Sequence, residues 1–281
     1  MTTTTRTAVA VPEAADSPLA RLRWTLADTW TLTLRGINHW IRQPLTVIGG
    51  LAFMIMLVAL YGLLFGGAIQ VPGGGSYMEF LLPGMFVMAM AFGIGETMTA
   101  VSVDAEKGVT DRFRSMPMAS GAVVLGRSVT DMIYSVVGLA VMVGAGLVLG
   151  WRWHGSIGET MTAFGLLLLL RFAMLWVGIF LGLIVPGPTA LNAVWTVLFP
   201  LTMVTAAFAP PETMPAWLGT VAEWNPLSAT IYATRDLFGN PGTGADSFVA
   251  QNAIALAIIW PVLIVAVFAP LSVWRYRNLS R

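Results

Sequence analysis

Three ionisable side chains lie inside long apolar stretches of this sequence: Glu96, Asp131 and Arg171. Charged groups at such depth are costly in a membrane, and they mark contacts that a structure or a function requires. One interpretation is an ion pair or network of Arg171 with Asp131 or Glu96 that fixes how helices pack. The other is a polar lining for a substrate path or a proton relay. We favour the packing interpretation and keep the second open.

Methionines are frequent in the stretch that carries Glu96. Met side chains are flexible and polarisable, which suits surfaces that bind varied apolar ligands. Ordinary helix packing is the alternative, and we favour it at any single position. The candidate residues of a substrate path are Met85, Met88, Phe92, Glu96, Asp131 and Arg171.

A charged run, DAEKGVTDRFRSMP at 104–117, interrupts the apolar sequence. Acidic residues stand at its start and arginines at its end, which matches the macrodipole of a short helix. Val109, Phe113 and Met116 follow the steps of one buried helix face, and Pro117 ends it. A solvated loop needs neither Phe113 nor mixed charges. We therefore predict a short cytoplasmic helix that docks on a partner, with Phe113 as its anchor and the charges setting the register.

Recognisable catalytic motifs are missing from the sequence. It has no GxxxxGK[ST] nucleotide-binding loop and no HExxH zinc motif. The two histidines, His39 and His154, fall on opposite sides of the membrane in the topology derived below. Cysteine is absent, which excludes disulfides and thiolate metal sites. We therefore predict no catalytic site, no metal site and no cofactor on this chain itself.

The elements that hold these residues are apolar helices. Charged residues make up 10% of the 281 positions and hydrophobic residues 57%, whereas a soluble domain carries about 25% charged residues. A helical span needs about 20 apolar residues, and backbone exposed to lipid must be helical. We predict an all-α integral membrane protein with six transmembrane helices in one transmembrane domain, 44–281. The spans are about 45–67, 78–101, 121–150, 161–186, 191–209 and 250–274.

The basic residues predict the orientation of the spans. Eleven of the 15 Lys and Arg residues precede the first span, lie between the second and third, or follow the sixth. With six spans these three segments share one side, and the positive-inside rule makes that side cytoplasmic. We therefore predict a multi-pass protein of the cell membrane with both termini in the cytoplasm.

Two further segments precede the first span. Residues 1–17 are small and polar, and we expect a disordered cytoplasmic leader. In 18–43 the apolar residues recur in steps of three and four, with arginines mainly on other faces. This pattern is typical of an amphipathic helix in the cytoplasmic interface, anchored by Trp and Arg. A soluble helix packed on a partner is the alternative.

The external segment between the fifth and sixth spans, 210–248, is long and patterned. MPAWLGTVAEW places tryptophans on one helix face. Asn225 and Pro226 resemble an N-cap followed by proline at the first helical position. GNPG then stops the apolar stripe that follows. We predict two short helices here, either on the outer surface or dipping back into the bilayer.

Two segments resemble a known family. DAEKGVTDRFRSMPMASGAVVLGRSVTD, which begins at residue 104, is similar to the loop after the second helix of ABC-2-type permeases. It looks most like the daunorubicin-resistance (DrrB-like) exporters of that family. PPETMPAWLGTVAEWNPLSATIYATRDLFGN, 210–240, resembles the external segment of the same family. The likeness extends over nearly the whole chain.

The resemblance implies partners and a function. In this family the permease is a homo- or heterodimer that works with two ABC ATPase subunits, which bind ATP and Mg. The interfacial helix and the first cytoplasmic loop contact the ATPase. We therefore expect the non-enzymatic permease subunit of an exporter that moves an amphipathic or hydrophobic small molecule (a drug, an antibiotic or a lipid) out of the cytoplasm or inner leaflet. The residues implied in coupling are Glu106, Lys107, Gly108, Asp111, Arg112, Phe113, Arg114, Met116 and Pro117.

Two other functions stay open. An ion-coupled secondary transporter would use Glu96 and Asp131 and would depend on a proton gradient instead of ATP. A non-transporting membrane scaffold would neither bind a substrate nor stimulate a partner's ATPase. No nucleic-acid partner is expected.

Overall fold

The computed structural model describes residues 18–42, 44–66, 71, 74–106, 120–185, 187–242 and 247–278. Within these residues the regular secondary structure is entirely helical, which confirms the all-α prediction. The predicted leader and the coupling residues from Lys107 to Pro117 lie outside the described residues.

In the described part of the chain, five helices are long and apolar enough to cross a membrane. A sixth apolar helix, α7 (Gly187–Met203), is shorter. The multi-span architecture is therefore confirmed, although the fifth expected span continued to residue 209 and α7 ends at Met203. The five long helices are α2 (Pro44–Phe65), α3 (Tyr77–Glu106), α5 (Ser120–Val148), α6 (Ile157–Ile184) and α11 (Ala253–Asn278).

The early end of α7 has a physical cause, because side chains of the segment 210–248 bind the backbone that follows it. The main-chain N–H of Ala206 donates to Ser228 Oγ at 3.0 Å. The carbonyl oxygens of Ala206 and Ala207 accept hydrogen bonds from Arg235 Nη2 at 2.9 and 3.1 Å. These backbone groups therefore have partners without a further helical turn.

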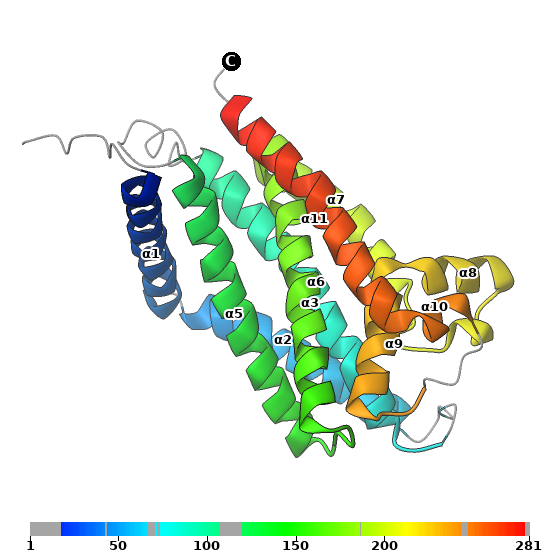
Figure 1. The fold of residues 1–281 in the computed structure, drawn as a ribbon. Helices are drawn as coiled ribbons and strands as arrows, with labels where there is room; N and C mark the ends of the chain where they lie inside the picture. Colours follow the sequence, from blue (N-terminus) through cyan, green and yellow to red (C-terminus); the bar gives the residue numbers. More distant parts are fainter. Residues whose placement is uncertain are drawn as a thin grey trace, which may run out of the picture.

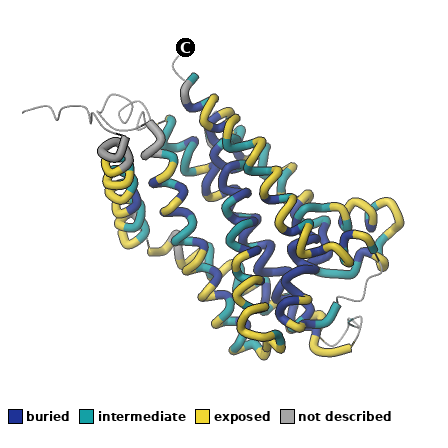
Figure 2. Tube along the Cα trace, viewed as in Figure 1, coloured by how far each residue is buried: buried dark blue, intermediate teal, exposed yellow. Residues whose placement is uncertain are grey.

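Helix α3 is the central element of the bundle and packs against α2, α5, α6, α7 and the short helix α9 (Pro226–Phe238) (Figure 1). Of its apolar stretch 83% is buried, against 11% in α2 and α11, whose outer sides are exposed (Figure 2). Glycines of α6 permit the close approach of the two backbones. A Cβ on Gly178 or Gly182 would lie 2.9 and 2.6 Å from the carbonyl oxygens of Ile94 and Met98.

The predicted amphipathic helix is confirmed as α1 (Pro18–Arg42), and it packs lengthwise beside α5 (Figure 1). Thr33 Oγ1 donates to the Gly126 carbonyl oxygen at 3.4 Å, and the Trp40 and Tyr134 rings are 5.1 Å apart. The later contact on α1, at Trp40, is also the later one on α5, at Tyr134, so the two helices run in the same direction. The packing of α1 along α5, instead of across it, was not foreseen, and its depth in the bilayer stays a prediction. The exposed apolar side of α1 carries Trp24, Leu26, Trp30, Leu34 and Ile41.

The segment 210–248 contains the two predicted short helices, α8 (Ala216–Trp224) and α9 (Pro226–Phe238), between the short turns η1 (Pro211–Thr213) and α10 (Phe248–Gln251). Asn225 caps α9 as expected: its Oδ1 accepts from the Leu227 N–H at 3.0 Å. Gly239 ends α9 in the left-handed conformation, with φ of 65°. Helix α9 is almost fully buried against α3, α6 and α11, whereas α8 lies at the rim (Figures 1 and 2).

Candidate functional site

The buried ionisable residues form a network at the contact of α3, α5 and α6. Arg171 of α6 is 1% exposed and donates from Nε to Ser135 Oγ at 2.7 Å and from Nη2 to Thr97 Oγ1 at 3.1 Å. Thr97 Oγ1 in turn donates to Asp131 Oδ2 at 2.7 Å. Arg171 Nη2 lies 3.9 Å from the same carboxylate oxygen. The Thr97 hydroxyl therefore bridges the arginine and the aspartate, and the direct ion pair is long.

A second arginine joins this network from the N-terminal part of α5. Arg127 Nε lies 3.1 Å from Asp131 Oδ1, one helical turn away. Asp131 is buried, so its charge is balanced by two guanidinium groups instead of by water. Gly93 of α3 makes room for Arg171, because a Cβ at this position would lie 2.5 Å from the guanidinium carbon.

Glu96 lies close to this network but has a different surrounding. Its carboxylate accepts a hydrogen bond from the Tyr134 hydroxyl of α5. Both groups lie beside Gly50 of α2, where a Cβ would be 3.7 Å from Glu96 Oε1 and 3.4 Å from the Tyr134 hydroxyl. Among the described residues, no Arg, Lys or His lies within ion-pair distance of Glu96, and its side chain is exposed.

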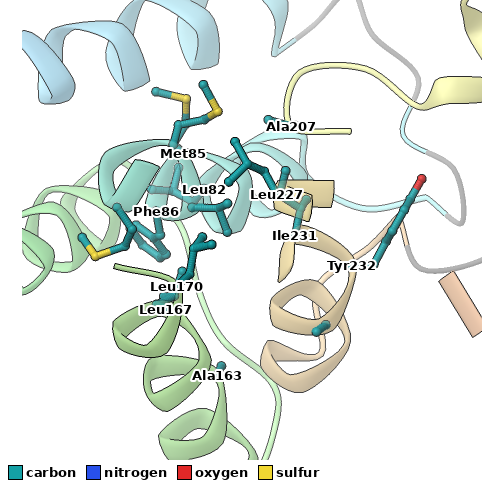
Figure 3. Close-up of a cluster of buried hydrophobic side chains, with 14 of the residues drawn as sticks. Leu82, Met85, Phe86, Ala163, Leu167, Leu170, Ala207, Leu227, Ile231 and Tyr232 are labelled. Carbon is teal, nitrogen blue, oxygen red and sulfur yellow. The ribbon is translucent and has the colours of Figure 1, made fainter. Parts of the chain in front are cut away.

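The remaining path candidates separate into two environments. Met85 and Met88 are fully buried in the core, where Met85 belongs to the same hydrophobic cluster as Leu82 and Phe86 of its own helix (Figure 3). Phe92 is only partly buried, and it contacts Phe199 of α7. The structure thus places Phe92 and Glu96 on an accessible side of α3, and it places the two methionines away from it.

Of the coupling candidates, only Glu106 falls within the described residues. It is exposed at the end of α3, and its Oε1 lies 3.0 Å from the position of a Cβ on Gly187, at the start of α7. Ser102 of α3 also donates to the Val185 carbonyl oxygen at 3.3 Å. The end of α3 that leads into the charged run therefore contacts the connection between α6 and α7.

Arg235 is a buried site that the sequence analysis did not single out. It is 1% exposed in α9, and its Nε donates to the Phe80 carbonyl oxygen at 3.0 Å. Its guanidinium carbon lies 3.7 Å from the centre of the Phe80 ring. Burial lowers the pKa of Arg235 to about 9, so it stays protonated at neutral pH. The signal was present, because Arg235 continues the stripe of Leu227 and Ile231 in steps of four.

A bundle of apolar helices with charged groups paired inside it is the architecture of a multi-span membrane protein, and comparisons with known proteins specify its class. Residues 27–238 match the family model of the ABC-2 type transporters. The chain is 31% identical over 255 residues to the daunorubicin resistance ABC transporter permease protein DrrB1 of Streptomyces coeruleorubidus, covering 90% of this chain and 86% of that protein. The chain therefore belongs to the ABC-2 transporter family and is a permease of that family.

Two more distant relatives agree with this assignment. The probable doxorubicin resistance ABC transporter permease protein DrrC of Mycobacterium tuberculosis is 22% identical over 238 residues, covering 84% of this chain and 85% of the relative. The putative transport permease ycf38 of Cyanophora paradoxa is 28% identical over 203 residues, covering 71% and 70%. Both are described as permeases, in agreement with the predicted role.

Proposed function

We propose that this chain is the membrane subunit of an ATP-driven exporter that moves amphipathic or hydrophobic small molecules out of the cytoplasm or the inner leaflet. The similarity over 90% of the chain to a daunorubicin resistance permease carries this proposal. The sequence contains no nucleotide-binding loop, so ATP must be hydrolysed on another chain. Drugs, antibiotics and lipids are the substrate classes to test.

The proposed assembly contains two permeases and two ABC ATPases, which bind ATP and Mg. The charged run 104–117 docks on the ATPase, with Phe113 as its anchor. Helix α3 leads directly into this run and is the most buried long helix. Movement of the run therefore has a rigid path into the bundle, both along α3 and through its contact with the start of α7.

The proposed orientation puts both termini in the cytoplasm. The distribution of Lys and Arg supports it, as argued from the sequence. Tyr276, near the end of α11, packs with Trp176 and Leu183 of α6. The C-terminal end of the chain thus lies at the same end of the bundle as the α6–α7 connection and the end of α3 (Figure 1).

ATP-driven transport in reconstituted vesicles tests the proposal. The permease is reconstituted with its partner ABC ATPase, and uptake of a fluorescent amphipath into inverted vesicles is followed with ATP. We expect Phe113→Ala and Arg112→Ala to reduce co-purification of the ATPase and transport together. Thr110→Ala, in the same run but outside its predicted apolar face, is the matched control and is expected to behave as the wild type.

The alternative functions predict different outcomes in the same vesicles. Transport that follows a proton gradient and ignores ATP would show an ion-coupled transporter. Bound ATPase whose activity no amphipath stimulates, together with no transport, would show a scaffold. Normal coupling in both variants would refute the docking role of the run while leaving an ATP-driven exporter intact.

A further inference from the structure

One side of α3 is open although the rest of this helix is buried. Its residues recur in steps of three and four, so they form one stripe, and the two in its cytoplasmic half are polar and exposed. We call it the open stripe of α3, and it comprises Ala89, Phe92, Glu96 and Thr99. An ionisable side chain exposed to lipid at this depth is costly. The open stripe must therefore face water, a ligand or protein instead of lipid chains.

Aromatic rings lie one helical turn from the Glu96 carboxylate on this stripe. The Phe92 ring lies parallel to that of Phe199, 5.9 Å away, and edge-on to Trp195, 6.1 Å away. Both partners belong to α7. A Cβ at Gly95 of α3 would overlap the Trp195 indole, so this glycine allows α7 to bring its rings against Phe92, one turn from Glu96. Phe199 is 47% exposed and thus presents much of its ring to a ligand.

The carboxylate itself is not neutralised by a direct partner. The basic groups that act on it electrostatically, Arg171 and Arg127, both pair with Asp131. Its hydrogen bond comes from the uncharged Tyr134 hydroxyl. Thr97 and Gly93, which face Arg171, lie on a neighbouring face of α3, about 100° and about 60° around the helix from Glu96. The carboxylate therefore keeps an accessible side that no described cation occupies.

We infer that the open stripe, together with Trp195 and Phe199, is a subsite for an aromatic organic cation, in which Glu96 selects the positive charge. A carboxylate next to exposed aromatic faces is the combination that recognises such cations, because the rings stack on the apolar body and attract the charge. The inference rests on the proposed export function and names its substrate class. Glu96 is then a specificity residue for cationic over neutral amphipaths.

Binding of two fluorescent probes to the permease–ATPase complex in lipid nanodiscs tests the inference. Ethidium is a planar aromatic cation, and N-phenyl-1-naphthylamine is aromatic and neutral near pH 7. We expect Glu96→Gln to weaken ethidium binding at least about tenfold, because the charge is lost at nearly constant shape. The same variant is expected to change binding of the neutral probe less than about twofold. Phe199→Ala, which removes a stacking surface, is expected to weaken both probes.

A second variant separates charge recognition from a change in structure. Tyr134→Phe removes the hydrogen bond to Glu96 but keeps the carboxylate, and it is expected to retain most ethidium binding. The inference is overturned if Glu96→Gln leaves ethidium binding unchanged, if it weakens both probes equally, or if the wild-type complex does not bind ethidium. ATP-driven transport of the neutral probe reports on the export function separately, and it is expected in Glu96→Gln as in the wild type. Absence of this transport in the wild type would overturn the proposed function instead.

Discussion

Two arginines, each 1% exposed, are buried in this bundle by different chemistry. Arg171 in the middle of α6 binds side chains, namely the hydroxyls of Ser135 and Thr97. Arg235 in α9 binds main-chain carbonyl oxygens and lies over an aromatic ring. Side-chain partners can change rotamer, whereas main-chain carbonyls move only when the fold moves. Arg235 is thus a fixed anchor for the segment 210–248, and the Arg171 network can rearrange as helices shift.

The comparison predicts that loss of Arg235 has the largest effect. Arg235→Met leaves the carbonyl oxygens of Phe80, Ala206 and Ala207 without their donor in an apolar environment. Each unmatched buried acceptor costs about 1–3 kcal/mol, so we expect at least about 3 kcal/mol of lost stability. Thermal unfolding of the detergent-purified protein measures this loss.

A lysine at the same position is the control for charge. Arg235→Lys keeps the positive charge but offers a single nitrogen, whereas the guanidinium group of arginine reaches several carbonyl oxygens. The stability of this variant is therefore expected to lie between those of the wild type and Arg235→Met. Wild-type stability in Arg235→Met would show that the three carbonyls do not depend on this side chain.

A double-mutant cycle in the Arg171 network is expected to give the next largest effect. Arg171→Met leaves the buried Asp131 with Arg127 alone, and we expect a loss of about 2–3 kcal/mol. In an Asp131→Asn background the same change is expected to cost about 1 kcal/mol less, because the charge it compensates is gone. Additive losses in the cycle would show that the two residues do not interact.

The network also explains why a charge swap is an unsuitable test of this pair. Exchanging Arg171 and Asp131 would place an arginine at position 131, one turn from Arg127. Two guanidinium groups would then repel each other even if the original interaction is real. The neutralising cycle avoids this problem.

Local features of the fold were predictable because they depend on short-range patterns. The lengths of the apolar stretches predicted the membrane-spanning helices. Asn225 with Pro226 correctly predicted the start of α9, and Gly239 its end. An ion pair of Arg171 with either Asp131 or Glu96 was also foreseen, since buried charges require partners, and the structure gives Asp131 as the partner. The bridging hydroxyls of Thr97 and Ser135 were not, because Ser and Thr in apolar helices carry no signal of their own in the sequence.

The open stripe was not predictable for a different reason. Helix α3 is apolar almost all round, so periodicity cannot tell which side stays uncovered. That depends on where α2 and α7 lie. Helix α7 approaches α3 closely at Gly95, whereas α2 lies in ordinary contact at Gly50. The burial of Arg235 likewise results from long-range packing, since Phe80 lies 155 residues earlier in the sequence.

Two glycines that differ in their surroundings sharpen the contrast between packed and open positions. A Cβ on Gly93 would lie 2.5 Å from the Arg171 guanidinium, whereas a Cβ on Gly165 of α6 has nothing within 4 Å. We expect Gly93→Ala to cost about 1–3 kcal/mol, because the arginine must shift. Gly165→Ala is expected to leave stability unchanged or raise it by up to about 1 kcal/mol through helix propensity. Equal unfolding temperatures for the two variants would contradict the placement of Arg171 against α3.

The bridging hydroxyl of Thr97 provides the smallest and most specific prediction. Thr97→Val keeps the shape but removes the oxygen that accepts from Arg171 and donates to Asp131. Hydrogen bonds between helices in a membrane contribute about 1 kcal/mol each, and the direct Arg171–Asp131 distance of 3.9 Å can shorten to compensate in part. We therefore expect a net loss of about 1 kcal/mol from Thr97→Val in the wild type, and a smaller one in Asp131→Asn. Thr97→Ser keeps the hydroxyl and is expected to match the stability of the wild type. If Thr97→Ser loses as much stability as Thr97→Val, the methyl group matters and the bridging hydroxyl does not.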